Sequence, residues 1–371
     1  MDGSQTITVA APSASYTVEI SRGATRRLAE LMASAGVRPT AAALLCDRAV
    51  EAGPAADAER SLEAAGIRTV RIPVPAEEQG KSLAALGDAC GRMLDAGLDR
   101  GSAVVAVGGG IVGDLAGFAA ATYMRGVSCV QVPTTLLAMV DASVGGKSAV
   151  NLVRPDGSLA KNILGSIVQP RLVVCDPESL GTLPVREVRG GLAECVKHAV
   201  IADPPMLAWL EARMEPILAR DPGTMAELVA RNVRVKAEVV GADEYERGRR
   251  AELNLGHTFA HAIESVLHGE CSHGEAVAIG MVAACRLATE TGLGSCGAEV
   301  AVCRALESAG LPIALPRPVD AARLRAAMDA DKKRQGGALR LVAPMALGVV
   351  RVVSGVPEAA ILAAWRAVGA A

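Results

Sequence analysis

The sequence predicts an α/β domain followed by a mainly α-helical domain. In the first half, short apolar runs alternate with helical segments, a pattern typical of a parallel sheet with crossover helices. From about residue 184 the strand signal nearly stops and helical periodicity takes over. The proline-containing segment 177–184 separates the two patterns. We therefore place the domains at residues 1–180 and 181–371, and we expect the functional site in a cleft between them.

The predicted elements follow in chain order. The runs TITVA and YTVEIS favour an opening hairpin, and buried strands are then predicted at AALLCD, IRTVRIPV, SAVVAVGGG, SCVQVPTT and LVVCD. Helices are predicted at TRRLAELMASAG and SLAALGDACGRMLDAG, between these strands. The second half predicts helices at PPMLAWLEARMEPILAR and TMAELVARNVRVKAEVVGADEYE, and a strand pair near LRLVAPMALGVVRVV. The first half is therefore predicted to form a Rossmann-like nucleotide-binding domain.

Composition excludes several classes of partner. A net charge of −2 favours neither nucleic acid nor an anionic membrane, and 2% aromatic residues leave little for base stacking. We expect a core of Ala, Val and Leu, no signal peptide and no membrane span. Nine cysteines without a CxxC pair predict reduced thiols, and hence a cytoplasmic protein.

A glycine-rich turn in the first domain predicts a nucleotide site. Gly108, Gly110 and Gly113 fit the pattern G-x-G-x-x-G between a predicted strand and a predicted helix. Such a turn lets the backbone approach a pyrophosphate, which the free N–H groups of the helix start then bind. The alternative is a tight turn found in any α/β protein. No acid follows about 20 residues later to hold the ribose, so a dinucleotide would be bound differently there.

Histidines cluster in the second domain. Four of the five lie in residues 253–281, and HTFAH places His257 and His261 on one helical face. His273 lies just before or at the start of the next predicted helix. Two imidazoles and one carboxylate would make a catalytic zinc-type site with an open position, and Glu194 is the candidate carboxylate. The alternative is a set of hydrogen-bonded core or surface histidines.

The remaining histidines carry weaker signals. His268 lies in a predicted loop and is equally consistent with a surface residue, whereas His198 is expected to be structural. The motif is not the HExxH of metalloproteases, because Thr258 follows His257.

Cationic residues recur near the motifs. Taken singly, each lysine is consistent with a solvated surface charge, but Arg250 precedes Asn254 by four residues and His257 by seven. A metal, a dinucleotide and several cations together indicate oxidation of a hydroxyl on a small, multiply anionic substrate. The cations in question are Lys147, Lys161, Lys197, Lys236, Arg250, Lys332 and Lys333.

Five motifs resemble the 3-dehydroquinate synthase family of the sugar-phosphate cyclase superfamily. They are GGGIVGDLAGFAAATYMRGV, VPTTLLAMVDASVGGKSAVN, LPVREVRGGLAECVKHA, RAELNLGHTFAHAIE and SHGEAVAIGM, and the likeness is collinear over roughly residues 40–350. The resemblance implies a phosphate-eliminating lyase of the shikimate pathway that depends on NAD and on zinc or cobalt. It would convert 3-deoxy-D-arabino-heptulosonate 7-phosphate to 3-dehydroquinate and phosphate by transient oxidation, elimination, re-reduction and aldol closure.

The resemblance also implies roles for individual residues. The metal ligands would be Glu194, His257 and His273. The residues at the NAD site would be Asp47, Glu78, Lys81, Gly109, Gly110, Asp114, Thr134, Thr135, Asp141 and Lys161. Those that grip substrate would be Lys147, Asn162, Lys197, Lys236, Arg250, Asn254, His261 and one of Lys332 and Lys333. Arg125 would reach the site of a neighbouring subunit, which implies a homodimer.

One departure leaves alternatives open. NLVRPDGSLAKN carries about five extra residues before Lys161, and RPDGS predicts a longer turn-containing loop that could alter the substrate mouth. A sister cyclase acting on another sugar phosphate, such as the amino analogue, is therefore an alternative. A metal-dependent alcohol dehydrogenase of the glycerol dehydrogenase type would not need the cations, and a non-catalytic descendant would have lost a ligand or a lysine.

Overall fold

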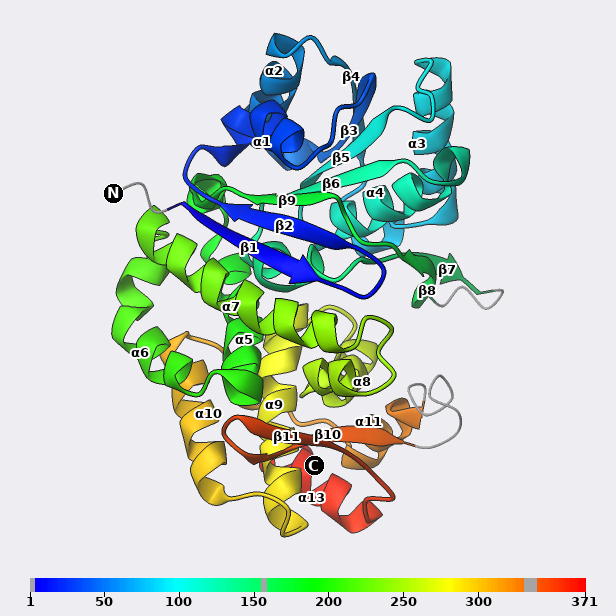
Figure 1. The fold of residues 1–371 in the computed structure, drawn as a ribbon. Helices are drawn as coiled ribbons and strands as arrows, with labels where there is room; N and C mark the ends of the chain where they lie inside the picture. Colours follow the sequence, from blue (N-terminus) through cyan, green and yellow to red (C-terminus); the bar gives the residue numbers. More distant parts are fainter. Residues whose placement is uncertain (1–3, 155–158, 330–338) are drawn as a thin grey trace. The chain divides into compact units, whose positions relative to one another are not determined.

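The computed structural model describes residues 4–154, 159–329 and 339–371. The chain packs into two compact units (Figure 1). The first unit comprises Met1–Pro184 and Arg220–Tyr245, and the second comprises Val185–Ala219 and Glu246–Ala371.

A seven-stranded sheet organises the first unit. Its order is β1-β2-β9-β6-β5-β3-β4; β1 pairs antiparallel with β2, and the five other neighbouring pairs are parallel. The predicted opening hairpin and buried strands are confirmed, as is the α/β class. The strands are β1 (Gln5–Ala10), β2 (Ser15–Ile20), β3 (Ala41–Asp47), β4 (Arg68–Val74), β5 (Ala103–Gly108), β6 (Ser128–Pro133) and β9 (Leu172–Cys175).

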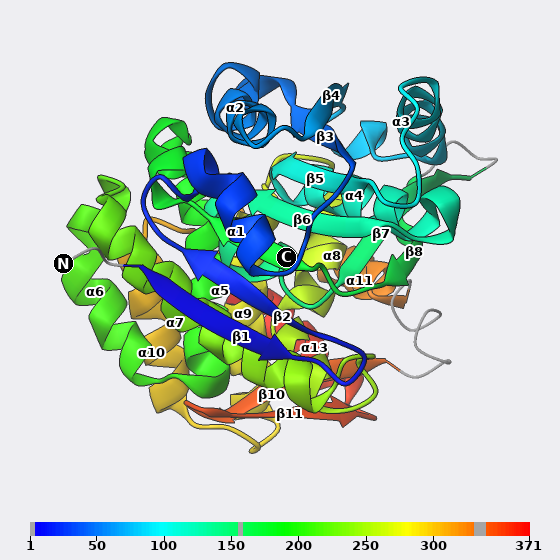
Figure 2. The ribbon, with the colours of Figure 1, turned by 45° about the horizontal axis from the view of Figure 1, so that its top comes forward.

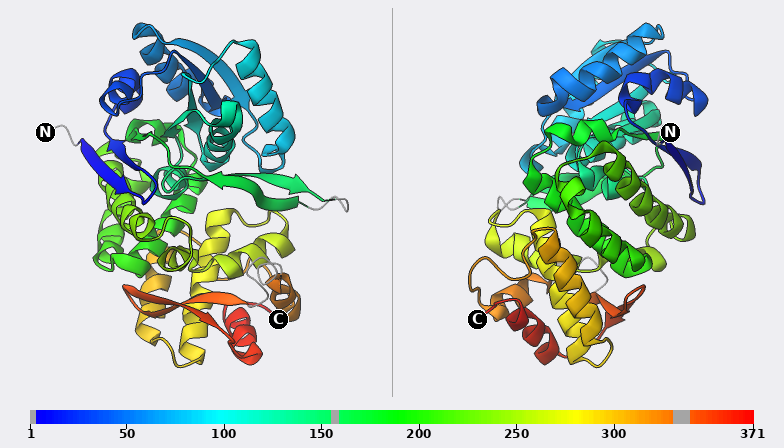
Figure 3. Two further views of the ribbon diagram at one scale, coloured as in Figure 1. Left: turned by 45° about the vertical axis from the view of Figure 1, so that its right-hand side comes forward. Right: turned by 90° about the vertical axis from the view of Figure 1, so that its left-hand side faces the viewer.

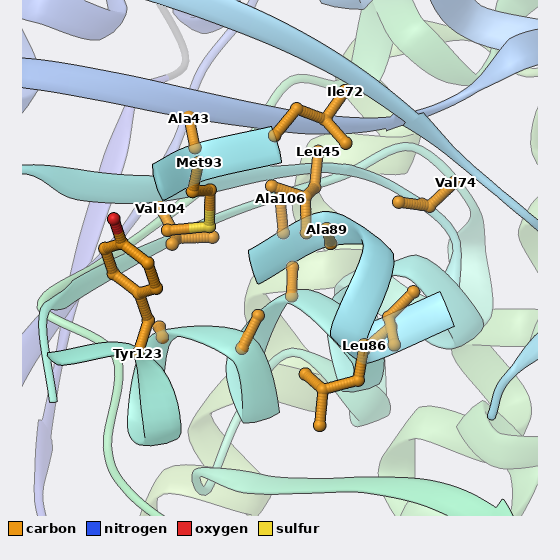
Figure 4. Packing of buried hydrophobic residues seen from close by; sticks show 14 of the residues in the cluster. Ala43, Leu45, Ile72, Val74, Leu86, Ala89, Met93, Val104, Ala106 and Tyr123 are labelled. Atoms are coloured by element: carbon orange, nitrogen blue, oxygen red, sulfur yellow. The ribbon is translucent and has the colours of Figure 1, made fainter. Parts of the chain in front are cut away.

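The central strands are buried on both faces because helices cover the two sides of the sheet. In β3, Leu45 faces a cluster that holds Met93 of α3 (Leu83–Asp95) and Leu115 of α4 (Gly110–Thr122), part of which is drawn in Figure 4. Its neighbour Leu44 faces the opposite cluster with Leu62, because successive strand side chains alternate. That cluster is closed by α1 (Leu28–Ser34) and α2 (Ala56–Ala64). Each buried leucine stabilises the fold by ~1.5–3 kcal/mol.

The inserted region is bordered by a hairpin that the sequence did not reveal. β7 (Lys147–Val153) pairs antiparallel with β8 (Leu159–Ile167). Most of the predicted RPDGS turn lies outside the described residues. The structure thus has two paired strands where we expected only a longer loop.

Helix α7 (Pro222–Ala242) packs with the first unit, although it follows residue 180 in sequence. Asp221 caps its start by accepting a hydrogen bond from the Thr224 amide at 2.7 Å. Its buried face contacts β1 and the turn η6 (Ala138–Ala142), and Figure 2 shows it beside β1. Residues 220–245, which the predicted division assigned to the second domain, therefore group with the first by packing.

The second unit is built around α9 (His273–Glu290). Side chains from Ala276 to Cys285 are buried all round this helix. It contacts α5 (Val185–Ala202), α8 (His257–Leu267), α10 (Cys296–Ser308) and α13 (Glu358–Ala367). In Figure 3 it is the yellow helix. Trp365 of α13 packs edge-on against Phe259 of α8, with ring centroids 4.9 Å apart. The predicted strand pair is present as β10 (Arg340–Ala346) and β11 (Val349–Ser354).

The other helices of the second unit are α5 (Val185–Ala202), α6 (Pro205–Leu218), α8 (His257–Leu267), α10 (Cys296–Ser308), α11 (Ala321–Ala327) and α13 (Glu358–Ala367). The short helical turns of the chain are η1 (Ala24–Arg27), η2 (Arg48–Val50), η3 (Glu51–Ala55), η4 (Glu78–Gly80), η5 (Tyr123–Arg125), η6, η7 (Pro177–Thr182) and η8 (Arg249–Asn254). Among the described helices, none combines the length and apolar character that crossing a bilayer would take.

Candidate metal centre and nucleotide site

The three predicted metal ligands converge within the second unit. One donor atom each from Glu194, His257 and His273 lies within 4.8 Å of the other two. Oε1 of Glu194 is 3.7 Å from Nε2 of His257 and 3.5 Å from Nε2 of His273. Two imidazole nitrogens and a carboxylate oxygen match the donor set of a catalytic zinc site with an open position. The His273 side chain is 39% exposed, whereas that of Glu194 is almost fully buried.

The local sequence places both histidines at the first residue of a helix. Gly256, at φ 80°, turns the chain into α8, which begins at His257. Ser272 caps α9, which begins at His273, by accepting a hydrogen bond from the Glu275 amide at 3.4 Å. Glu275 in turn accepts one from the Ser272 amide at 2.8 Å, which completes a capping box. Both imidazoles therefore project from well-defined first turns, toward Glu194 in the middle of α5.

Each imidazole has a second partner that orients it. Nδ1 of His257 lies 3.2 Å from the Leu255 carbonyl and donates to it, so Nε2 keeps its lone pair for a metal. Nδ1 of His273 lies 3.6 Å from Oε1 of Glu264. Outer partners of this kind fix the tautomer and the ring plane of metal-bound histidines. We did not predict Glu264 from the sequence, although its position seven residues after His257 on one helical face was a usable signal.

A lysine supplies the countercharge of this site. Nζ of Lys197 pairs with Oε2 of Glu194, and both side chains are almost fully buried. Burial opposes ionisation of Glu194, but Lys197 and the two histidines outweigh it and hold its pKa well below the usual range. Burial likewise lowers the pKa of His257 far below its usual value. An ionised carboxylate and a neutral imidazole are the forms that bind metal.

His273 differs from His257 in the metal-free site. Burial works to lower the pKa of His273, but its interactions with Glu194 and Glu264 outweigh burial and raise the pKa to about 9. A metal must therefore displace a proton from His273 at neutral pH.

The other predicted residues of the second unit differ in their burial and in their distance from the three ligands. The exposed ring of His261 lies one turn from His257, with centroids 5.8 Å apart. Arg250 is 2% exposed in η8, and the Asn254 amide donates to Glu246. His268 is exposed at the end of α8, away from the triad's contacts, as its weak signal suggested. Lys332 and Lys333 lie outside the described residues.

In the first unit, seven of the ten predicted nucleotide residues lie at or after the carboxyl ends of four adjacent parallel strands. Asp47 ends β3, Glu78 and Lys81 follow β4, the Gly109–Gly110 turn follows β5, and Thr134 and Thr135 follow β6. Ligands of parallel α/β sheets bind at this edge. Gly109 caps α4, and its carbonyl accepts a hydrogen bond from the Gly113 amide at 3.0 Å. The first amides of a helix have no partner within it, so a helix start of this kind can bind a phosphate.

A buried lysine connects this edge to the β7–β8 hairpin. Nζ of Lys81 lies 2.9 Å from Oδ2 of Asp114 and 2.6 Å from Oδ1 of Asn162. The side chain of Asn151 bonds to both the carbonyl and the carboxylate of Glu78, at 2.8 and 2.7 Å. Burial raises the pKa of Asp114 despite the attraction of Lys81. The structure thus joins residues predicted for cofactor and for substrate into one network.

The remaining predicted residues of the first unit are dispersed. Lys236 of α7 is buried and pairs with Asp141 of η6. Lys147 and Lys161 are exposed on β7 and β8. Arg125 is exposed at φ 68°, just beyond the end of α4 opposite to the glycine turn. The structure therefore does not bring Arg125 to the nucleotide residues of its own chain.

Comparison with known proteins agrees with these features. The model of the 3-dehydroquinate synthase N-terminal domain matches residues 71–190, and that of the 3-dehydroquinate synthase C-terminal domain matches residues 191–334. The chain is 48% identical over 305 residues to a 3-dehydroquinate synthase of Symbiobacterium thermophilum, covering 82% of this chain and 84% of the relative. It is 42% identical over 365 residues to that of Caulobacter vibrioides, covering 97% of both chains.

A solved structure extends the comparison to three dimensions. The 2-epi-5-epi-valiolone synthase of Streptomyces hygroscopicus, with NAD+ and Zn2+ bound, superimposes with a TM-score of 0.85 at 28% identity, covering 96% of this chain and 97% of that one. It shares the two-part architecture but is less similar in sequence than the two synthases above. The motifs, the fold and the family models agree, and the chain belongs to the 3-dehydroquinate synthase family.

Proposed function

We propose that this protein converts 3-deoxy-D-arabino-heptulosonate 7-phosphate to 3-dehydroquinate and phosphate, as a carbon–oxygen lyase of the shikimate pathway. The observation that carries the proposal is the Glu194–His257–His273 triad with Lys197 against its carboxylate, in a chain that both family models match. NAD and a divalent metal, zinc or cobalt, are the proposed cofactors. We assign nucleotide binding to the first unit and metal binding to the second.

The residues of the second unit suit the proposed metal chemistry. Glu194, His257 and His273 would hold the ion, and Lys197 keeps the carboxylate ionised in its buried position. A metal held there would supply Lewis-acid polarisation of a substrate hydroxyl, and bound NAD would supply a reversible hydride acceptor for that carbon. His261, whose exposed ring lies beside His257, would relay a proton or bind phosphate.

Buried cationic side chains would also orient the anionic substrate. Lys197, Lys236 and Arg250 are buried, so their charges act in a medium of low dielectric and hold a phosphate or carboxylate more firmly than surface lysines would. Fixing the phosphate aligns its bond for elimination, which lowers the entropic part of the barrier. Asn162, Asn254 and the exposed Lys147 and Lys161 are further proposed contacts to substrate or cofactor.

We also propose a cytoplasmic homodimer in which Arg125 completes the site of the neighbouring subunit. The exposure of Arg125, beyond the end of α4 opposite to the glycine turn, supports this role. The hairpin also exposes Leu152, Val153 and Ile163, apolar side chains suited to an interface. Mixing two inactive variants, Arg125→Ala and His257→Ala, should restore part of the activity if Arg125 acts across subunits. No recovery in an assembly shown to be mixed would exclude that role.

The decisive experiment is phosphate release from 3-deoxy-D-arabino-heptulosonate 7-phosphate in the presence of NAD and zinc, with NADH absorbance followed in parallel. Phosphate release without NADH build-up, and a product consumed by a dehydroquinate dehydratase, is expected because the hydride returns within each turnover. Release only from the amino analogue, or from another sugar phosphate, would identify a sister cyclase. Steady NADH accumulation with simple alcohols would identify a dehydrogenase and contradict the proposal.

A further inference from the structure

Helix α5 meets the start of α9 in three consecutive contacts. Arg186, Gly190 and Glu194 are spaced by four residues and so lie on one face of α5. Their partners run backwards along the start of α9: Arg186 bonds Glu275, Gly190 touches Gly274, and Glu194 faces His273. One of the three contacts is the metal site itself, and the other two precede it along α5.

The first contact is a bidentate ion pair. Nε of Arg186 donates to Oε1 of Glu275 at 2.9 Å, and Nη2 donates to Oε2 at 2.7 Å. Oε2 also accepts the Ser272 amide as part of the capping box. Glu275 therefore ties the first turn of α9 both to its own cap and to α5, two residues from His273. Bidentate guanidinium–carboxylate geometry fixes orientation as well as distance.

The second contact sets how closely the two helices approach. A Cβ built on Gly274 would lie 2.4 Å from the Cα and the carbonyl oxygen of Gly190, so only glycine fits. A Cβ on Gly190 would meet no described atom outside its own helix within 4 Å. The contact thus depends on the absence of a side chain at Gly274, directly after the metal ligand, and tolerates one at Gly190.

We propose that the Arg186–Glu275 pair and the Gly190–Gly274 contact are positioning elements that hold His273 at the correct distance from Glu194, and thereby set the metal affinity. This inference rests on the proposed metal centre. Neither element touches the ion, so each acts through the placement of His273. Outer-shell partners that orient a ligand typically change metal affinity by about 10- to 100-fold when they are removed.

The chain offers a matched control for the ion pair. Arg304 of α10 pairs with Glu211 of α6 at 2.9 Å, with side chains 65% and 25% exposed. The corresponding values for Arg186 and Glu275 are 58% and 22%. Both pairs join two helices of the second unit, so a general loss of stability should be similar in the two cases. Only the Arg186 pair adjoins a metal ligand.

The experiment measures zinc affinity of the full-length protein by competition with a chromophoric chelator, together with the visible spectrum of the Co2+ form. We expect Arg186→Gln to weaken zinc binding about tenfold and to alter the Co2+ bands. Arg186→Lys should recover part of the affinity, because it restores the charge without the bidentate geometry. Arg304→Gln should leave both readouts unchanged. Equal affinities and spectra in Arg186→Gln and wild type would overturn the role of the ion pair.

The glycine contact supplies an independent test. Gly274→Ala should weaken zinc binding or prevent folding, whereas Gly190→Ala should keep wild-type affinity and spectrum. If Gly274→Ala folds and binds zinc with wild-type affinity, the close approach of the two helices does not determine the zinc affinity of the site. A wild-type protein that binds no zinc through Glu194, His257 and His273 would instead contradict the proposed function, so the two failures are distinguishable.

Discussion

Lys197 pairs with one oxygen of Glu194, three residues earlier on α5, and leaves the other oxygen facing His257 and His273. The carboxylate therefore serves two partners at once. Its Oε2 is neutralised by a buried ammonium group, and its Oε1 is presented to the candidate metal. Without metal, Lys197 is the main positive charge that balances the Glu194 carboxylate. With metal bound, the ion would share that role.

Replacing Lys197 should destabilise the metal-free protein more than the zinc-bound one. In Lys197→Met a buried carboxylate loses its cation, a change that typically costs about 3–5 kcal/mol. Zinc replaces the missing positive charge, so the midpoint of thermal unfolding should fall in EDTA and recover largely when zinc is added. Turnover should be lost in both conditions. Equal unfolding midpoints of variant and wild type in EDTA would show that the pair does not matter for stability.

Removing the outer partner of His273 should weaken metal binding. Glu264→Gln keeps a hydrogen-bond acceptor near Nδ1 of His273 but removes the charge, and the affinity for zinc should fall about 10- to 100-fold. The control is His268→Asn, because His268 is exposed, away from the triad's contacts, and Asn tolerates its left-handed φ of 43°. Competition with a chelator measures both variants, and a Glu264→Gln affinity equal to that of the control would contradict the assignment.

Metal binding should release about one proton per ion at pH 7.5. His273, with a pKa raised to about 9, is protonated in the metal-free site, whereas the lowered pKa values leave Glu194 ionised and His257 neutral. Protons therefore compete at one ligand, and affinity should rise about tenfold per pH unit up to about pH 9, then level off. Calorimetry in two buffers of different ionisation enthalpy counts the protons. A pH-independent affinity between pH 6.5 and 8.5 would contradict the charge state given to His273.

Variants of the Lys81–Asp114 pair should show that its effect on stability and its effect on cofactor binding are separable. Lys81→Met leaves Asp114 buried without its cation, so the free energy of unfolding should fall by about 3–5 kcal/mol. Adding Asp114→Asn removes the stranded charge and should restore most of the stability. The double variant should nevertheless bind NAD weakly, because both side chains are proposed cofactor contacts. Denaturant unfolding and NAD titration test this, and wild-type NAD affinity in the double variant would exclude both contacts.

The sequence predicted the sheet and the histidine cluster of the candidate metal site because each has a strong local signal. Short apolar runs such as SAVVAVGGG, followed by a glycine turn, are typical of strands buried in a parallel sheet, and β5 is buried along its whole length. The i, i+4 spacing of His257 and His261 placed both on α8. Spacing along the chain says nothing about contacts between α5 and α8. It therefore offered Glu194 only as a candidate carboxylate for His257 and His273, and the family resemblance then supported that choice.

Features that depend on distant partners were not predictable in this way. The hairpin strands β7 and β8 carry exposed apolar and charged side chains, such as Val153 and Lys161, and so lack clear alternation. Helix α7 has an obvious buried face, but periodicity identifies a face and not the element that covers it. The Lys81 network likewise joins residues up to 81 positions apart.

The return of α7 to the first unit has a consequence for synthesis of the chain. When Pro184 leaves the ribosome, β1 and η6 still lack the helix that covers them, because α7 is encoded only at residues 222–242. At about 5–20 residues per second, this helix follows several seconds later. Until then, the nascent sheet lacks the helix that covers β1 and η6 in the finished fold. A gene truncated at the boundary between the two halves would make that absence permanent.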